Sequence, residues 1–152
     1  MPSTHLSLYY HLVFSTKNRE PWFTDELLPR AHVYLGGCVR TAGGVAEAIG
    51  GVDDHVHILV SLRSTHRLAD VLHDVKQKSS EWFHEATRRF AFAWQEGYGA
   101  FSYGHSQLNT IIRYIQNQER HHQKRSFKVE YLTLLRKFDI AFDDKYVFKF
   151  IE

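Results

Sequence analysis

The distribution of hydrophobic residues along the chain separates short strand-like segments from longer segments with helical periodicity. Segments rich in β-branched and aromatic residues, bounded by glycine or polar residues, predict four strands: residues 6–15, 45–49, 54–62 and a stretch with alternating Phe90, Phe92 and Trp94. Only residues 50–53, Gly-Gly-Val-Asp, separate the second strand from the third. These two strands are therefore predicted to form a hairpin.

Apolar residues at helical spacing predict four helices. Candidate N-caps of the first three are Thr24, Thr65 and Ser106, and the fourth, which precedes an aromatic-rich tail, contains Phe127, Tyr131, Leu134 and Leu135. The first helix has no clear end near Gly36-Gly37. The order of elements predicts an α+β fold: a ferredoxin-like sandwich with helices on one face of a mainly antiparallel sheet, plus a C-terminal helix that carries Tyr114.

The composition is that of a single domain covering residues 1–152. Of these 152 residues 43% are hydrophobic, enough for one substantial core. The first ten residues lack the basic start and apolar run of a signal peptide, and no stretch of about 18 apolar residues could span a bilayer. A cytoplasmic protein without a membrane partner is therefore expected. The single cysteine, Cys38, is predicted to be a buried thiol, so any bound metal is expected to have nitrogen and oxygen ligands.

The segment His55-Val56-His57 is the first candidate for chemistry. Alternate residues of a strand share a face, so both histidines point to one side while Val56 points to the other. The Cα atoms of the histidines would lie roughly 6.5 to 7 Å apart, close enough for both imidazoles to bind one ion. A third ligand would still be needed, and a solvated strand face also explains the pattern. Asp53 and Asp54 are possible oxygen ligands, although a turn explains them as well.

Tyr114 and Gln118 are candidates on the helix after Ser106. Four residues apart, they would lie one turn from each other on the same face, beside the apolar stripe of that helix. Gln118 could supply the missing oxygen ligand, and Tyr114 would then lie one turn from the same ion. A tyrosine at the edge of the core and a solvated glutamine would give the same pattern.

Basic residues surround and follow the tyrosine, although the formal net charge of the chain is only +2. That charge permits nucleic-acid binding without indicating it. Phosphate contacts are predicted for Arg113, Arg120, Lys124 and Arg125, with a solvated face as the alternative. The neighbouring His121 and His122 are expected to face water, with DNA binding as the alternative.

Five segments together resemble the HUH-type single-tyrosine transposases of bacterial insertion sequences, in particular the insertion-sequence-200-like kind. They are residues 10–17 (YHLVFSTK), 54–60 (DHVHILV), 94–95 (WQ), 97–102 (GYGAFS) and 114–118 (YIQNQ). Each segment is short, but their order and spacing are specific and they extend over most of the chain. The resemblance implies that His55, His57 and Gln118 bind a metal ion and that Tyr114 is the nucleophile.

For function, the resemblance implies transposition by cleavage and rejoining of single-stranded DNA. Tyr114 would attack a phosphodiester, release a 3′-hydroxyl and retain the 5′-phosphate, with Mg²⁺ or Mn²⁺ as the metal and no nucleotide cofactor. The implied partners are the hairpin ends of a mobile element and a second copy of the chain, in a homodimer whose active sites can be shared. Candidates for base stacking are Tyr98, Phe101 and Tyr103. The alternatives are a nucleic-acid-binding module without cleavage and a hydrolase that uses water.

Overall fold

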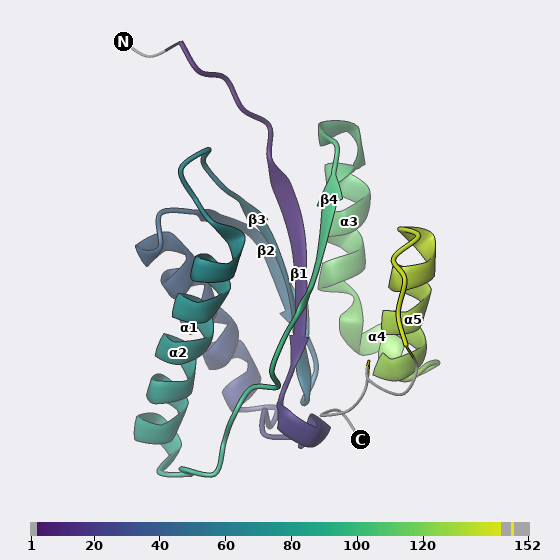
Figure 1. The fold of residues 1–152 in the computed structure, drawn as a ribbon. Helices are drawn as coiled ribbons and strands as arrows, with labels where there is room; N and C mark the ends of the chain where they lie inside the picture. Colours follow the sequence, from purple (N-terminus) through teal and green to yellow (C-terminus); the bar gives the residue numbers. More distant parts are fainter. Residues whose placement is uncertain (1–2, 144–146, 148–152) are drawn as a thin grey trace.

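A four-stranded antiparallel sheet forms the centre of the protein in the computed structural model, which describes residues 3–143 and residue 147 (Figure 1). Its strands are β1 (Tyr9–Ser15), β2 (Val45–Gly51), β3 (His55–Ser61) and β4 (Gly99–Tyr103), in the spatial order β2-β3-β1-β4. Between β1 and β2 the chain forms a 3-10 helix, η1 (Lys17–Arg19), and helix α1 (Leu27–Thr41), and helix α2 (Leu68–Thr87) connects β3 to β4. This connectivity is the ferredoxin-like arrangement that the sequence predicts.

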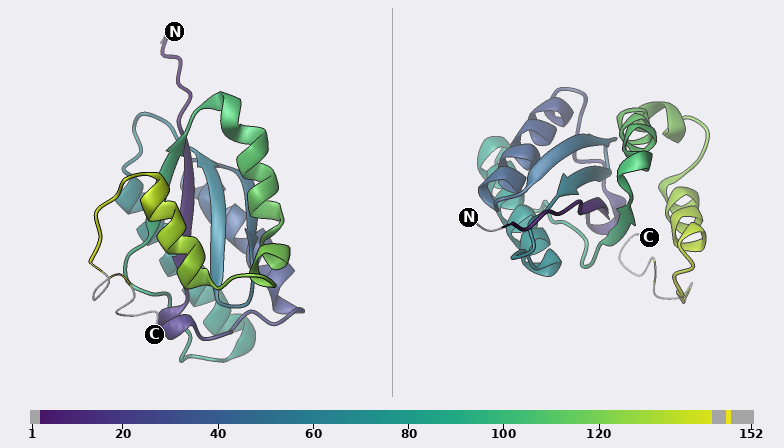
Figure 2. Two further views of the ribbon diagram at one scale, coloured as in Figure 1. Left: turned by 90° about the vertical axis from the view of Figure 1, so that its right-hand side faces the viewer. Right: turned by 90° about the horizontal axis from the view of Figure 1, so that it is seen from above.

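Different helices cover the two faces of the sheet (Figure 2). Helices α1 and α2 pack on one face. The other face carries the C-terminal elements: a 3-10 helix η2 (His105–Gln107), α3 (Leu108–Gln116), α4 (Gln118–His122) and α5 (Phe127–Lys137). The tyrosine-bearing helix α3 contacts β2 and β3. Among the helices in the described ranges, none is both long and apolar enough to cross a membrane.

Strand β3 lies between β2 and β1, and it is buried on both faces because helices pack on each side of the sheet. Val56, Ile58 and Val60 point into the core shared with α1 and α2. His55 and His57 point to the opposite face, beneath the C-terminal helices, and both are 0% exposed. The alternation predicted for this strand is confirmed, but the histidine face is not solvated.

The prediction of a strand through Phe90, Phe92 and Trp94 is wrong. The fourth strand is β4, further along the chain, and Trp94 forms only an isolated bridge with Thr16. Phe92 is 2% exposed, and its ring stacks on Phe83 of α2 at a centroid distance of 4.2 Å. Phe92 and Trp94 therefore pack into a cluster beside α1 and α2 rather than pairing within the sheet, whereas Phe90 is 66% exposed.

Other limits of the elements also differ from the sequence predictions. Helix α1 continues through Gly36-Gly37, and Cys38 is buried within it as predicted. Arg67, rather than Thr65, occupies the N-cap position of α2. Ser106 lies inside η2 instead of capping α3. The end of the predicted aromatic-rich tail lies outside the described residues.

Helix α3 approaches β2 very closely at Gly50. A Cβ atom built on Gly50 would lie 1.9 Å from the carbonyl oxygen of Ile115, a backbone atom in the last turn of α3. No side chain can therefore be accommodated between the strand and the helix at this point. Because Ile115 directly follows Tyr114, this contact sets the position of Tyr114 over the sheet.

Replacing Gly50 with alanine is expected to displace α3 and lower the free energy of unfolding by about 1–3 kcal/mol, the usual cost of overpacking. Thermal denaturation followed by circular dichroism measures the loss. Gly37→Ala is the matched control, because its Cβ would meet no atom within 4 Å and the residue lies inside α1, where alanine favours the helix. If Gly50→Ala melts at the wild-type temperature, this contact does not fix α3.

Candidate active site

The two histidines of β3 face a carboxylate that comes from the C-terminal helix α5. His55 Nε2 and His57 Nε2 lie 3.5 Å and 3.1 Å from Oε1 of Glu130. Glu130 is 1% exposed, and both histidines are fully buried. A buried carboxylate needs paired charges or hydrogen bonds to offset its lost hydration, and the imidazoles provide them.

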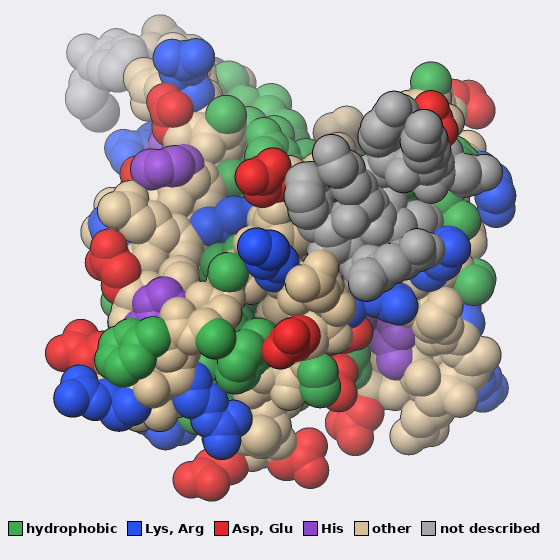
Figure 3. Space-filling view, turned by 60° about the horizontal axis from the view of Figure 1, so that its bottom comes forward, with side chains coloured by type: hydrophobic (Ala, Val, Ile, Leu, Met, Phe, Trp, Pro, Cys, Tyr) green, Lys and Arg blue, Asp and Glu red, His purple; other side chains and the backbone are tan. Residues whose placement is uncertain are grey.

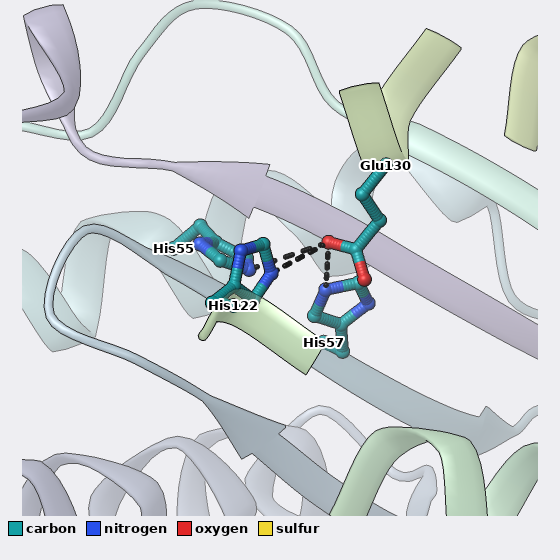
Figure 4. A group of neighbouring side chains, drawn as sticks. All are labelled: His55, His57, His122 and Glu130. Atoms are coloured by element: carbon teal, nitrogen blue, oxygen red, sulfur yellow. Dashed lines mark hydrogen bonds and ion pairs between the residues drawn. The ribbon is translucent and has the colours of Figure 1, made fainter. Parts of the chain in front are cut away.

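His122 of α4 completes a group of four neighbouring side chains. Its Nε2 lies 3.0 Å from Oε1 of Glu130. One ligand atom from each of His55, His57, His122 and Glu130 lies within 4.8 Å of the other three. Figure 4 shows the three imidazoles gathered around the carboxylate, two from β3 and one from α4. The expectation that His122 faces water is therefore wrong, and its side chain is only 12% exposed.

Gln118 lies against the same group and is 1% exposed. Its Oε1 lies 3.3 Å from His55 Nε2 and 3.1 Å from His122 Nε2. Its Nε2 donates a 3.1 Å hydrogen bond to Oε2 of Glu130. The amide oxygen thus faces the imidazole nitrogens, an orientation compatible with the ligand role predicted for Gln118.

Tyr114 contacts Oε2 of Glu130, the carboxylate oxygen that the histidines do not contact. Its hydroxyl donates a hydrogen bond to Oε2, and its ring meets that of His57 edge to face at a centroid distance of 5.9 Å. The sequence places Tyr114 and Gln118 on one continuous helix, and this is wrong. Asn117, at φ −100° and ψ 23°, separates α3 from α4. Both side chains still reach Glu130, so the break does not separate them in space.

Two polar residues contact the outer nitrogens of the β3 histidines. His55 Nδ1 donates a 2.8 Å hydrogen bond to Oδ1 of Asp54. His57 Nδ1 lies 2.7 Å from Nε2 of His11, a fully buried residue of β1. Partners of this kind fix the ring orientation and the tautomer of a metal-binding histidine. Asp54, weighed from the sequence as a possible ligand, therefore orients His55 from the side away from the cluster.

Residues 4–118 match the family model described as "Transposase IS200 like", which thus covers the larger part of the chain. The chain belongs to the IS200-like transposase family. This match includes β3, with His55 and His57, and α3, with Tyr114. No curated protein sequence matches this transposase.

Solved structures share the fold of the transposase at low sequence identity. A candidate transposase from Deinococcus radiodurans R1 matches with a TM-score of 0.62 and 22% identity, over 78% of this chain and 96% of that chain. A REP-associated tyrosine transposase bound to a REP hairpin matches with a TM-score of 0.54 and 12% identity, over 76% of this chain and 70% of that chain. These likenesses support the α+β fold.

Three residues of the transposase site were not singled out by sequence patterns: His11, His122 and Glu130. Glu130 carried a usable signal, because it lies on the helix face that also holds Phe127 and Leu134, and a charged residue on an apolar face is rarely buried without a partner. His11 carried a weaker signal, since it is a polar residue within an otherwise apolar and aromatic part of β1. His122 also carried a signal, because it lies four residues after Gln118 and so shares a helix face with that predicted ligand.

Burial and charge give the groups of this site different proton affinities. Burial lowers the pKa of His55, but hydrogen bonds with Asp54 and Glu130 outweigh it and raise the pKa to about 9. Burial lowers the pKa of His57 to about 4, despite its contact with Glu130. Burial raises the pKa of Tyr114, and the Glu130 carboxylate raises it further, so the phenol is protonated at neutral pH. Hydrogen bonds from the histidines outweigh burial and hold the pKa of Glu130 well below its usual range.

These shifts predict that the metal-free transposase is most stable near pH 6.5. His55 binds its proton more tightly when folded, so its contribution is complete below its ordinary pKa of 6.5 and is lost as the pH rises to about 9. His57 binds its proton less tightly when folded, so its contribution is complete above 6.5 and is lost as the pH falls to about 4. Urea denaturation in the presence of a chelator measures both limbs.

The variant His55→Gln isolates the alkaline limb of that profile. It is expected to lack most of the decline in the free energy of unfolding between pH 6.5 and about 9, while the acidic limb remains. An unchanged alkaline decline in this variant would show that another group titrates there.

The predicted phosphate-binding residues differ in their exposure and in the cavities that they border. Arg125 borders two cavities, one of which also contains Tyr114 and the other His122. Arg113, Arg120 and Lys124 are exposed, whereas Arg125 is half-buried. Figure 3 shows basic and acidic side chains intermixed on the face at the bottom of Figure 1. Local cations such as Arg125, rather than a uniformly basic surface, are therefore available to attract a phosphate to the cluster.

The aromatic residues predicted to stack on bases are largely buried. Phe101 and Tyr103 point from β4 toward the C-terminal helices and are 2% and 9% exposed. The stacking prediction is therefore wrong for Phe101. Tyr98 packs against the core on the other face, with Lys76 Nζ 5.7 Å from its ring centroid. Tyr103 differs from Phe101 in that it borders a cavity.

The side chains of the cluster fit a divalent cation. Three imidazoles, one carboxylate and the Gln118 oxygen converge in a buried space, and Glu130 Oε1 is already shared among three nitrogens. Imidazole and carboxylate groups are common ligands of such ions. Asp54 and His11 hold the outer nitrogens of His55 and His57, which leaves the inner Nε2 atoms facing the centre.

Proposed function

We propose that this transposase cleaves and rejoins single-stranded DNA by transesterification through Tyr114. The observation that carries the proposal is the contact between Tyr114 and a buried group of metal-ligand side chains contributed by β3, α4 and α5. Membership of the IS200-like transposase family supports the same chemistry. The single-stranded substrate would be met on the nucleoid, in the cytoplasm of a bacterium or archaeon.

In the proposed reaction, Oη of Tyr114 forms a bond to the phosphorus of a phosphodiester while the bond from phosphorus to the 3′-oxygen breaks. The 5′-phosphate remains on the tyrosine, and the 3′-oxygen takes a proton from water. The phenolic proton must leave before or during attack and passes to water, because the low pKa of Glu130, whose Oε2 contacts the phenol, makes that carboxylate a weak base. A second 3′-hydroxyl can reverse the step on another strand, so no nucleotide cofactor is required.

His55, His57 and Gln118 are the proposed ligands of Mg²⁺ or Mn²⁺, and His122 and Glu130 enlarge the donor set. A divalent ion held there would polarise the phosphate and offset the negative charge of Glu130 that stabilises the neutral phenol. Imidazole suits Mn²⁺ better than Mg²⁺, which prefers oxygen ligands. The imidazole-rich donor set therefore favours Mn²⁺.

The proposed partners are DNA hairpins and a second copy of the chain. A related fold was solved as a tyrosine transposase bound to a REP hairpin, which supports a hairpin ligand for this family member as well. Tyr114 contacts Glu130 of its own chain. Sharing of active sites in a homodimer would therefore require α3 to leave this contact and reach the partner subunit.

The deciding experiment incubates the transposase with labelled single strands taken from the DNA that flanks its gene, with Mn²⁺, with Mg²⁺ or with a chelator. A protein-DNA adduct that survives denaturation is expected with metal and is expected to be absent with the chelator. Nicked DNA without an adduct would favour a water-using hydrolase instead. Binding without cleavage under every condition would favour a nucleic-acid-binding module.

Replacing Glu130 with glutamine is expected to weaken Mn²⁺ binding by at least about tenfold, because it removes the negative charge at the centre of the donor set but keeps the size of the side chain. Calorimetric titration of the folded variant measures the affinity. Glu119→Gln, at an exposed position of α4, is the matched control and should bind Mn²⁺ as the wild type does. Equal affinities for Glu130→Gln and wild type would exclude Glu130 as a ligand.

A further inference from the structure

A cavity of about 410 Å³ lies between α3 and α5, directly beside Tyr114. Among its lining residues are Tyr103, Thr110, Tyr114, Arg125, Thr133 and Lys137. Its volume falls within the range of pockets that bind small organic ligands. Nothing in the proposed chemistry of Tyr114 and the histidine cluster accounts for this space, so its occupant is a separate question.

The lining combines the groups that a nucleotide requires. Arg125 and Lys137 supply two positive charges for a phosphate against the single carboxylate of Glu130, and the ring of Tyr103 supplies an aromatic wall. Thr110 and Thr133 add hydroxyl groups from the two facing helices. The Thr133 hydroxyl already donates to the carbonyl of Val129 at 2.8 Å, so toward a ligand it offers its lone pairs as an acceptor.

The position of the cavity identifies which nucleotide it would hold. In an in-line displacement the entering and leaving oxygens lie on opposite sides of the phosphorus. The 3′-oxygen must therefore depart on the side away from Tyr114. The nucleoside that remains tied to Tyr114 through its 5′-phosphate needs space next to the tyrosine, and this cavity provides it.

A second cavity of about 400 Å³ lies beside His122 and differs in character. Asp53 and Asp54 line it, and two carboxylates repel a phosphate unless cations offset them. Arg125 lines both cavities. A DNA strand that crosses the histidine cluster would thus meet Arg125 between the two cavities. The cavity beside Tyr114 has fewer carboxylates in its lining than the cavity beside His122.

We infer that the cavity between α3 and α5 is a nucleoside pocket, which receives the nucleoside immediately 3′ of the cleaved phosphate and so contributes to the choice of cleavage site. The inference rests on the proposed function for its biological meaning. The binding of a single nucleotide, however, does not depend on cleavage. The pocket can therefore be tested separately from the reaction.

The first test uses ¹H–¹⁵N correlation spectra of the full chain carrying Tyr114→Phe, titrated with each of the four deoxynucleoside 5′-monophosphates. Amide signals of Thr110, Thr133 and Lys137 are expected to shift for at least one of them. Adding Thr110→Phe, which fills the cavity, should abolish the shifts, whereas Asn109→Phe on the exposed surface of α3 should not. The absence of shifts with all four mononucleotides would overturn the pocket.

The second test maps the cleavage position on flanking single strands and then places one abasic site either immediately 3′ of that position or further downstream. An abasic site immediately 3′ of the cleaved phosphate is expected to reduce adduct formation about tenfold, in line with the loss of one stacked base. An abasic site further downstream should have little effect. Adduct formation that is insensitive to the adjacent abasic site and to Thr110→Phe would overturn the inference and leave the proposed function intact. A wild-type protein that forms no adduct on any strand would instead overturn the proposed function.

Discussion

The Tyr114→Phe transposase is expected to form no covalent adduct with single-stranded DNA. The substitution removes only the phenolic oxygen, the atom proposed to bond to phosphorus, and loss of a nucleophile typically costs several orders of magnitude in rate. The ring remains between α3 and the sheet, where it packs against His57, so the fold should be retained. Denaturing electrophoresis of labelled DNA with Mn²⁺ measures the adduct.

Binding must be measured alongside cleavage for this variant. Single-stranded DNA and Mn²⁺ are both expected to bind Tyr114→Phe with affinities near those of the wild type, because none of the proposed metal ligands has changed. Tyr10→Phe, on the opposite face of the sheet, is the matched control and should retain the adduct. Undiminished adduct in Tyr114→Phe would exclude Tyr114 as the nucleophile.

Replacing His57 with glutamine is expected to weaken Mn²⁺ binding by at least about a hundredfold and to remove the adduct with it. His57 is fully buried, and its Nε2 faces Glu130 at 3.1 Å while its Nδ1 contacts His11. Loss of the imidazole removes one of the two nitrogen ligands fixed by β3. Glutamine retains a polar side chain, which limits the cost of the substitution to folding.

The control for His57→Gln is His73→Gln, because the His73 side chain is 75% exposed and lies outside the cluster. Calorimetry with Mn²⁺ and the adduct assay should both give wild-type results for that variant. Circular dichroism establishes that each variant is folded. Metal affinity that survives His57→Gln would remove His57 from the ligand set, even if cleavage is lost.

The local periodicity of hydrophobic residues in the sequence was sufficient to predict much of the fold. The alternation along β3 depends only on the geometry of an extended chain, so it identified the shared face of His55 and His57 before any packing was known. The apolar spacing of α2 and α3 likewise located both helices. The alternation of Phe92 and Trp94 was misleading, because a hydrophobic cluster can impose the same period as a strand.

The candidate site could be predicted only in part. His55, His57 and Tyr114 lie in short segments that also carry the family resemblance, so the sequence was sufficient to select them as candidates. His122 and Glu130 come from α4 and α5, and neither has a local pattern that points to β3. Glu130 could have been suspected from its place on the buried face of α5, and His122 from its position one helical turn after Gln118.

The sequence by itself determined which residues share a face of β3 or of an unbroken helix such as α2, because those relations follow from backbone geometry over a few residues. The tertiary structure decided which of those faces meet. It brought Glu130 between Tyr114 and the histidines, ended α3 at Asn117, and left a cavity beside the tyrosine. These features depend on contacts between segments far apart in the chain, where packing and charge, rather than local conformation, select the arrangement.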